Sequence, residues 1–580
     1  MKRFFLPLIA LFTLSASLLS AQGFYVSLEG SDDNPGTKAK PFRSLAAARD
    51  AVRKVNRDMD GDIVVYLGGG VYPISETVKF GPEDSGFNGH KVIYRAAEGE
   101  KPILTGGVAV TGWKLHDKDK NIYRAPAPKT VFRQVYINDK PGVRARTPNR
   151  ESETTFGPYL RLEVPKKPEC HIVKKDWSAV EGVRRLDEVE LVIETHWYHQ
   201  RIRIGKHRET DDGVVVLPVA PAGKMSKKLG FYRVSYFFFE NALEFIDTPD
   251  EWYHDPRAGF LYMAVDKGTD PNKQRVEVPV TSTLLAIRGT ADKPVENIEF
   301  DGLTFQCSNW DSPSRLGLNV TQFVQPMAVK RSWESSDYPM GIVRAAHARR
   351  IAFRNNTIRN AGANGIQFYM NVDDSDIEGN HIYQIAANGI EIDAYAAKNP
   401  PPERQSTGVA VWNNHIHKAG QNYTNGGGLL AHNVRGLIVE HNHIHDMPYS
   451  GMQIGNQPGG MRDIGCGDNR VRYNHVHHCL QLHDDGGGIY TLGGIQRGSI
   501  IAENYLHDIV TSKWAGNYPI DLIYLDNYTS KILVKDNVVN GGRAAERNRS
   551  AGNTLVNNSQ SNPNVENDAG IKPGYELRGE

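Results

Sequence analysis

The chain has little cysteine, and its few cysteines form no recognisable pattern. Four are scattered through the 580 residues: Cys170, Cys307, Cys466 and Cys479. Their spacing matches no zinc motif. Only the last two are close in sequence, so a Cys466–Cys479 disulfide and buried free thiols between coils are both open.

Charge of one sign and long apolar runs are also scarce. The net charge is +1, which gives no field to attract nucleic acid, so no nucleic-acid partner is expected. The one long apolar run, from Phe4 to Leu19, is too short for a comfortable membrane span, and no membrane contact is expected. Its basic start and the small residue Ala21 are typical of a secretory signal peptide. The sequence predicts a periplasmic or secreted monomer, processed near Ala21 and without a lipid anchor.

Helical periodicity is missing from the C-terminal half, where a repeat takes its place. Seven segments share an asparagine followed two places later by an aliphatic residue, and the asparagines are 24, 34, 28, 32, 30 and 33 residues apart. They are Asn356, Asn380, Asn414, Asn442, Asn474, Asn504 and Asn537. One supersecondary unit is therefore used seven times.

A second strand follows the polar corner in each unit and usually begins after a glycine. These glycines are Gly365, Gly389, Gly428, Gly451 and Gly488, and a sixth strand runs from Leu522 to Asp526. Because side chains alternate along a strand, the aliphatic residues one and three places after the glycine point inward. The residues two and four places after it point outward and stack in columns.

The repeat predicts an all-β protein built on a right-handed parallel β-helix, in which each coil buries its face by stacking on its neighbours. We expect a signal peptide at 1–21, a cap and first coils at 22–105, and the main β-helix with its active-site groove at 291–545. Residues 106–290 lack the repeat and have the alternation of an inserted antiparallel β domain. Residues 546–580 are expected to form a polar tail along the helix.

Near the start of the chain, Ser44 is placed to cap a short helix whose Leu45, Ala48 and Val52 share one face. We expect this helix to cover the open edge of the first coil. The turn Asp32-Asp33-Asn34 offers three oxygens to a structural calcium ion, which is few, so a capped turn is favoured. No other cofactor and no catalytic metal are expected.

The outward columns predict a polar groove along the coils. Their members include Glu391, Asp393, His432, Gln453, Tyr490, Tyr524 and Asp526. Carboxylates, an imidazole, amides and phenols suit a sugar, whose hydroxyls need donors and acceptors and whose ring faces stack on aromatics. A carbohydrate substrate is therefore expected.

Hydrolysis of a glycosidic bond needs two carboxyl groups roughly 5 to 10 Å apart. Coils stacked at about 4.8 Å place Asp393 and Asp526, four coils apart, at roughly 19 Å, so they cannot flank one bond. Asp485 comes from the coil immediately before Asp526, beside a bend of three glycines at 486–488 that can fold it over the groove.

Two neighbouring aspartates have other interpretations. Asp521 has the parity of the inward Ile523, which favours a corner role over catalysis. Asp484 and Asp485 together could also form an ordinary acidic turn.

Histidine pairs with i, i+2 spacing recur on three successive coils. They are His415/His417, His443/His445 and His475/His477. Metal ligands converge on a point, whereas these residues extend along a ladder, so the sequence favours a stacked, solvent-facing ladder over a zinc site. His432, one coil from Asp393, is either a substrate contact or proton relay, or part of a surface ion pair.

Several motifs resemble known proteins. The opening Phe24-Tyr25-Val26-Ser27, with Gly30 to Thr37 and Lys40-Pro41-Phe42, resembles bacterial right-handed parallel β-helix proteins, many of them carbohydrate-active. With the insertion, the motifs His483 to Tyr490 and Tyr524 to Asn527, and the tail Glu566 to Ile571, the chain resembles glycoside hydrolase family 141. That family includes α-L-fucosidase and xylanase activities on plant cell-wall polysaccharides.

The resemblance implies an exported hydrolase of fucosidase or xylanase/xylosidase type whose catalytic aspartates fall on Asp485 and Asp526. One would protonate the leaving oxygen, and the other would act as nucleophile or activate water. We expect substrate contacts at Tyr490, Tyr524, His432, Asp393, Glu391, Gln453, His483 and Trp514.

Two other functions stay open. A polysaccharide lyase would need a Lys or Arg base and a cation over a uronate, and the outward columns contain no Lys or Arg. A non-catalytic glycan-binding protein would use the aspartates only as hydrogen-bond acceptors.

Overall fold

The computed structural model describes residues 23–151, 156–162, 170–218, 235–326, 331–393, 402–456, 463, 465–547 and 550–575. The expected signal peptide, 1–21, lies outside the described residues. Within the described part of the chain, no helix is long and apolar enough to cross a membrane.

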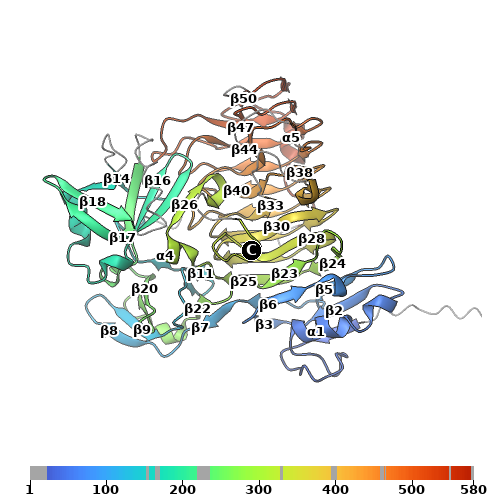
Figure 1. Ribbon diagram of the computed structural model, residues 1–580, viewed down its shortest axis with the longest axis horizontal. Coiled ribbons are helices and arrows are strands. Elements are labelled where there is room, and N and C mark those ends of the chain that lie inside the picture. Colours follow the sequence, from blue (N-terminus) through green and yellow to red (C-terminus); the bar gives the residue numbers. More distant parts are fainter. Residues whose placement is uncertain are drawn as a thin grey trace, which may run out of the picture.

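Short parallel strands wind round three faces of a solenoid, which rises from blue to red in Figure 1. Face 1 consists of β4 (Val78–Phe80), β23 (Leu285–Arg288), β28 (Gly341–Arg354), β30 (Asn364–Asp373), β33 (Ile390–Ile392), β37 (Leu429–Ala431), β41 (Met452–Asn456), β44 (Gly486–Leu492), β47 (Ile520–Asp526) and β50 (Ala544–Glu546). Face 2 consists of β1 (Gly23–Val26), β2 (Ile63–Leu67), β5 (Val92–Ala96), β24 (Val295–Asp301), β31 (Asp376–Glu378), β35 (Ala410–Trp412), β39 (Ile438–Glu440), β42 (Arg470–Arg472), β45 (Ile500–Ala502), β48 (Leu533–Lys535) and β51 (Thr554–Val556). Face 3 consists of β3 (Gly70–Pro73), β6 (Pro102–Thr105), β25 (Thr304–Ser308), β29 (Thr357–Ala361), β32 (His381–Ile385), β36 (His415–His417), β40 (His443–His445), β43 (His475–His477), β46 (Tyr505–His507) and β49 (Val538–Val539).

Strand β28 connects two of these faces. Its first part pairs with β23 and β30 and its second part with β24 and β31. Faces 1 and 2 therefore form one 21-stranded sheet, while face 3 is a sheet of ten strands. The aliphatic residues predicted to point inward, such as Ile489 and Ile523, are fully buried in the central core. The predicted parallel β-helix is confirmed.

Glycine stands at the start of several face 1 strands because neighbouring coils are too close together there to accommodate a side chain. A Cβ at Gly428 would lie 2.7 Å from the carbonyl oxygen of Gly451, and a Cβ at Gly451 equally close to that of Gly488. Such contacts are below van der Waals distance, so a larger residue would force the coils apart.

The repeated asparagines form a buried ladder between faces 2 and 3. Asn442 shows the pattern: its Nδ2 donates to Asn474 Oδ1 (2.9 Å) and to the carbonyl of Val411 (2.9 Å). Its Oδ1 accepts from the backbone N–H of Asn414 at 3.0 Å. Each side chain therefore satisfies backbone groups of adjacent coils, as the sequence predicts.

Helix α1 (Leu45–Val52) lies near the first coil (Figure 1). Ser44 caps it by accepting from the N–H of Ala47 at 3.1 Å, and Leu45, Ala48 and Val52 are its buried residues. Asp32 Oδ1 accepts from the backbone N–H of Ser44 at 2.8 Å, as in a capped turn.

The insertion lies beside the solenoid (Figure 1), and its strands pair antiparallel except for β12 (Val143–Arg144) with β20 (Glu251–Asp255). Its elements are β7 (Gly107–Ala109), β8 (Lys114–Asp117), β9 (Ile122–Pro126), β10 (Tyr136–Ile137), β11 (Lys140–Pro141), β12 (Val143–Arg144), β13 (Arg146–Thr147), β14 (Leu160–Leu162), β15 (Cys170–Val173), α2 (Lys174–Trp177), β16 (Glu190–Thr195), β17 (Tyr198–Glu209), β18 (Gly213–Pro218), β19 (Ser235–Glu240), β20 (Glu251–Asp255), β21 (Phe260–Ala264) and β22 (Val276–Pro279). The hairpin of β26 (Leu318–Thr321) and β27 (Gln325–Pro326), which follows α4 (Ser312–Leu316), joins the insertion's largest sheet because β26 pairs with β17.

A cluster of buried charges in the insertion contacts the solenoid through Arg201. Arg133 Nη1 lies 2.6 Å from Glu190 Oε1, and Arg201 contacts both Glu190 and Glu240. Arg201 Nη2 also donates to the carbonyl of Asn422, in the loop before β37, at 2.7 Å. These ion pairs lie within the insertion, and the hydrogen bond from Arg201 to Asn422 is the contact among them that joins the insertion to the solenoid.

The end of the chain adds one more coil and then runs back along the solenoid. Strands β50 and β51 pair with β47 and β48. After α5 (Pro563–Asp568), Gly570 bonds to Tyr473, Lys572 to Asn413 and Tyr575 to Glu378, so the tail passes successively earlier coils. All four cysteines are buried free thiols, so the alternative of a Cys466–Cys479 disulfide is wrong.

Candidate active site

The two predicted catalytic aspartates come from consecutive coils of face 1. Strands β44 and β47 pair in parallel, with Tyr490 opposite Tyr524 and Leu492 opposite Asp526. Asp485 directly precedes β44 and has a left-handed backbone (φ 56°). This conformation is uncommon outside glycine and marks a turn.

Two tyrosine–aspartate hydrogen bonds cross between the coils. The phenol of Tyr490 donates to Asp526 Oδ2 at 2.8 Å, and the phenol of Tyr524 donates to Asp485 Oδ1 at 3.0 Å. The two rings meet edge to face, with centroids 5.2 Å apart. Each coil therefore holds the carboxylate of the other, and the four side chains form one cluster.

The cluster lies in the outward columns, which are predicted to form a polar groove, and it is buried. Tyr490 and Tyr524 are fully buried, Asp526 is 2% exposed and Asp485 is 7% exposed. The turn between β16 and β17 reaches over this region: the ring of His196 packs on Tyr518 at 4.5 Å and that of Trp197 at 5.2 Å. The insertion and the loop before β47 therefore meet over the outward columns at this level of the solenoid.

Burial gives Asp485 the character of an acid. Its pKa rises from an ordinary 3.8 to about 7, mainly because burial disfavours the charged form. The negative charge of Asp526 raises the pKa further, and the hydrogen bond from Tyr524 opposes the rise. A carboxyl group with this pKa keeps a proton near neutral pH, as a general acid must.

Asp484, the neighbour of Asp485, holds the turn in place. Its Oδ1 accepts from His196 Nδ1 at 2.8 Å, and its Oδ2 accepts from the backbone N–H of Tyr518 at 3.0 Å. The phenol of Tyr449 donates to the carbonyl of Asp485 at 2.8 Å. Sequence reasoning missed these positioning residues, since His196 is 288 positions from Asp484 and no motif links them.

His483 and Trp514, both predicted substrate contacts, lie against the insertion. His483 Nδ1 donates to the carbonyl of His196, and its Nε2 lies 3.0 Å from Thr424 Oγ1. Burial lowers the pKa of His483, so the ring is neutral at neutral pH. Trp514 packs edge-on against Tyr159 and Tyr236, at 5.2 Å from each ring.

Glu391 and Asp393 are buried farther along face 1, beside an arginine that the columns do not contain. Glu391 accepts from Gln367 Nε2 at 2.9 Å and from Arg331 Nη2 at 3.2 Å. Asp393 lies 3.8 Å from Arg331 Nη1 and accepts from Asn433 Nδ2 at 3.2 Å. Burial raises the pKa of Asp393 to about 7, although Arg331 opposes the rise. The outward columns contain no arginine, but Arg331 reaches this face from a segment outside them.

Gln453 and His432 lie between these two regions. Gln453 is opposite Tyr490 on the neighbouring strand and is fully buried, yet neither amide atom has a hydrogen-bond partner among the described residues. Buried amides in proteins are nearly always hydrogen-bonded, so Gln453 is a candidate contact for a ligand beside Tyr490. His432 is 1% exposed, and its backbone N–H donates to Ile392 at 3.2 Å.

Asp521, the rival carboxylate, is held by two arginines. Its carboxylate accepts from Arg543 Nε and from Arg547 Nε, each at 2.8 Å. This ion pair gives Asp521 a structural partner at the corner of the coil. In the described residues, side chains that converge as metal ligands lie on face 3, away from the aspartate cluster.

Comparisons with known proteins match both parts of the chain. Residues 121–265 match the GH141 insertion domain, and residues 341–517 match the right-handed β-helix region. A solved structure named "Glycoside hydrolase" is 26% identical, with 96% of this chain and 100% of that chain covered and a TM-score of 0.88.

More distant structures share less of the architecture. XylC with xylose is 15% identical, with 91% of this chain and 70% of that chain covered and a TM-score of 0.47. The GH136 lacto-N-biosidase from Eubacterium ramulus is 10% identical, with 93% and 67% covered and a TM-score of 0.38. No curated protein matches the chain.

The insertion domain and the full-length structural match agree with the fold described above and with the resemblance that the motifs carry. The protein is a glycoside hydrolase in which an insertion that matches the GH141 insertion domain interrupts a right-handed parallel β-helix.

Proposed function

We propose that the protein is exported and hydrolyses plant cell-wall polysaccharide or oligosaccharide, as an α-L-fucosidase or a xylanase/xylosidase. Asp485 is the acid that protonates the leaving oxygen, and Asp526 is the nucleophile or the base that activates water. The observation that carries this proposal is the crossed cluster, in which Asp485 and Asp526 face each other through Tyr490 and Tyr524.

The two carboxyl groups have environments suited to opposite roles. Asp485 has a pKa of about 7, so a substantial fraction carries a proton at neutral pH. Asp526 accepts a hydrogen bond from the phenol of Tyr490 and another from Asn527 Nδ2 at 3.3 Å. One carboxyl group acting as the acid and a second acting as nucleophile or base are the recurring arrangement of glycoside hydrolases.

Three further groups support sugar binding beside the aspartates. Gln453 offers an amide donor and acceptor that the described protein does not use. Tyr490 and Tyr524 present aromatic rings in the same column. Their phenols are engaged by the aspartates, so the two tyrosines hold the carboxyl groups beside Gln453.

The experiment is a hydrolysis panel with aryl α-L-fucoside, β-xyloside, α-L-arabinoside and α-galactoside, together with xylan and pectin fragments. Wild type is compared with Asp485→Asn, Asp526→Asn and the control Asp508→Asn, which alters an exposed carboxylate on face 3. We expect one sugar to be released by wild type and by the control but not by the two cluster variants.

Other outcomes are equally clear. Release that survives both cluster substitutions would contradict the choice of carboxylates. An unsaturated product absorbing in the ultraviolet would identify a lyase, and glycan binding without turnover would identify a binding protein. Export is tested by locating the full-length chain in cell fractions; unprocessed protein confined to the cytoplasm would contradict it.

A further inference from the structure

Face 3 carries two rows of outward histidines. On β36, β40 and β43 a buried aliphatic residue separates two histidines, so both point away from the core. The first row is His381, His415, His443 and His475; the second row is His417, His445, His477 and His507. We call the eight residues the histidine ladder.

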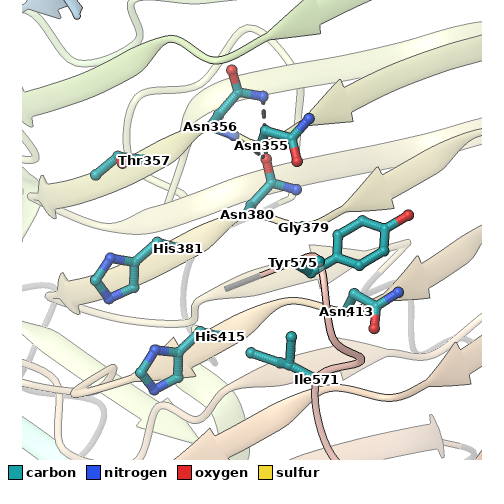
Figure 2. A pocket seen from close by; sticks show the side chains of 11 residues that line it. Asn355, Asn356, Thr357, Gly379, Asn380, His381, Asn413, His415, Ile571 and Tyr575 are labelled. Carbon is teal, nitrogen blue, oxygen red and sulfur yellow. Dashed lines mark hydrogen bonds between the residues drawn. The ribbon is translucent and has the colours of Figure 1, made fainter. Parts of the chain in front are cut away.

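The imidazoles of each row stack on one another. Ring centroids within a row are 4.7 to 5.1 Å apart, and the ring planes differ by 3° to 11°. Figure 2 shows His381 and His415 one above the other on adjacent strands. The stacking follows from the register of the coils, which places the same side chain at one strand spacing after another.

Nitrogen atoms of the two rows converge, which the sequence could not show. The Nε2 atoms are 2.9 Å apart for His381 and His417, 2.7 Å for His415 and His445, and 2.8 Å for His443 and His477. Three triads result, in each of which all ligand atoms lie within 4.8 Å of one another. They are His381/His415/His417, His415/His443/His445 and His443/His475/His477.

We propose that the histidine ladder binds late first-row divalent transition ions of the Zn²⁺, Ni²⁺ and Cu²⁺ class, each held by one triad. Imidazole nitrogen is a preferred ligand of these ions, and three histidines with a solvent molecule in the fourth position make a recurrent zinc environment. Each triad draws its ligands from two adjacent coils, so a bound ion ties these coils together.

The surroundings of the ladder suit metal ligands. His445 Nδ1 lies 3.0 Å from Asp446 Oδ2, the carboxylate contact that orients metal-binding histidines in many proteins. A small cavity opens beside His381 and His415, between the coils and Tyr575 of the tail (Figure 2).

The competing interpretation is a stack of imidazole–imidazole hydrogen bonds without metal. Distances of 2.7 to 2.9 Å between Nε2 atoms fit an N–H donor and an N acceptor. Zn–N bonds of about 2.0–2.1 Å in a tetrahedron need ligand nitrogens roughly 3.3 Å apart. Metal binding therefore requires each pair to separate by about half an ångström, a movement within the reach of side-chain rotation.

The sharing of residues between triads predicts the stoichiometry. The middle triad shares His415 with the first and His443 with the third, whereas the first and third share none. We therefore expect two ions per chain, in the first and third triads.

The test titrates the metal-free, full-length protein with Zn²⁺ by calorimetry and with Co²⁺ by visible absorption, which is intense for tetrahedral cobalt. Wild type should bind two ions in the micromolar range or tighter, and Zn²⁺ should displace Co²⁺. Zn²⁺ should also raise the thermal midpoint, since it binds only the folded chain, and a chelator should reverse this rise.

Three matched variants separate the triads. His415→Gln with His443→Gln breaks all three triads and should abolish binding. His381→Gln with His475→Gln spares the middle triad and should leave one ion. His445→Gln breaks only the middle triad and should leave two ions. The control is His116→Gln with His207→Gln, two exposed histidines of the insertion, which should match wild type.

The outcomes decide the proposal without reference to the proposed hydrolytic function, because the ladder is on a different face from the aspartates. Absence of tetrahedral Co²⁺ bands in wild type would overturn it and establish the hydrogen-bonded stack. Unchanged binding in the His415→Gln/His443→Gln variant would also overturn it. If that variant does not fold, the fall from two ions to one in His381→Gln/His475→Gln supplies the decision.

Discussion

Two aspartates one coil apart have different environments, and that difference defines the candidate chemistry at the scale of single residues. Asp485 is raised to a pKa of about 7 by burial and by the charge of Asp526. Tyr524 opposes this rise by donating to the ionised form. The hydrogen bond from Tyr524 therefore lowers the pKa of Asp485, the proposed acid.

Replacement of Tyr524 by Phe should shift the basic limb of the pH–rate profile to higher pH. The substitution removes the hydrogen bond that lowers the pKa of Asp485, so the acid keeps its proton to higher pH. Activity requires protonated Asp485 and is lost as pH rises through its pKa. Tyr490→Phe is the matched control, since it removes a phenol that contacts Asp526 instead. A basic limb that moves equally in both variants would contradict this role.

Asp485→Asn should make the protein more stable at pH 8 than wild type. The folded-state pKa of Asp485, about 7, lies above the ordinary 3.8. Between these values the folded protein holds a proton that the unfolded chain has released, so stability falls as pH rises from about 4 to 7.

Asparagine cannot ionise, so the variant escapes this loss. At about 1.4 kcal/mol per pKa unit, the gain is of order 1–4 kcal/mol above pH 7 and vanishes near pH 4. Thermal midpoints of both proteins at pH 4.5 and pH 8 check it. An equal difference in thermal midpoint at the two pH values would show that burial does not destabilise the ionised form of Asp485.

The placement of Asp485 and Asp526 on adjacent coils could be predicted from the sequence, but their burial could not. The repeat gives the coil on which each residue lies, and coil spacing excludes Asp393 as a direct partner of Asp526. The contact between His196 and Asp484 joins positions 288 residues apart and leaves no periodic signal. The contact between Arg331 and Glu391 is equally unpredictable, because Arg331 belongs to a segment outside the repeat.

At the scale of elements, both the asparagine ladder and the glycine column allow the coils to stack closely. The ladder satisfies backbone groups at the corner between faces 2 and 3, and the glycines allow adjacent strands to approach on face 1. Both features are periodic, which is why the sequence predicts the β-helix.

Asn442→Ala should destabilise the protein by roughly 2–4 kcal/mol, because it leaves the Asn414 N–H and the Val411 carbonyl buried without partners. The control is Asn558→Ala at the end of the ladder, where the side chain is less buried and the loss should be smaller. Denaturant unfolding of the two variants measures the difference. Equal losses would mean that the ladder adds nothing beyond its local corner.

At the scale of the whole molecule, the solenoid supplies the two aspartates of the candidate site, and the insertion supplies His196, which holds the turn beside Asp485. The hydrogen bond from Arg201 to Asn422 and the β26–β17 pairing dock it, and the turn at His196 and Trp197 packs against Tyr518 in the loop before β47. The sequence predicts that an antiparallel domain interrupts the repeat. The docking could not be predicted from the sequence. Its contacts join the alternating strands of the insertion to the repeat of the solenoid, and neither pattern specifies which residues of the other it meets.

His196→Ala should lower kcat/KM by about 10- to 100-fold, since misplacement of a catalytic group by a fraction of an ångström has costs of this size. The substitution removes the bond that holds Asp484 and so loosens the turn that carries Asp485. His196 is a positioning residue, so the pH dependence should stay in place while the rate falls. His207→Ala, on the exposed part of β17, the strand that follows this turn, is the control and should keep wild-type rates.

The most direct test of the central claim is the leaving-group dependence of Asp485→Asn, measured with aryl glycosides of the sugar that the hydrolysis panel identifies. If Asp485 is the acid, the variant should be close to wild type with an activated leaving group such as dinitrophenol and severely slowed with a poor one. The Asp526→Asn variant should be slow with both. Equal slowing of Asp485→Asn across all leaving groups would contradict the assignment of Asp485 as the acid.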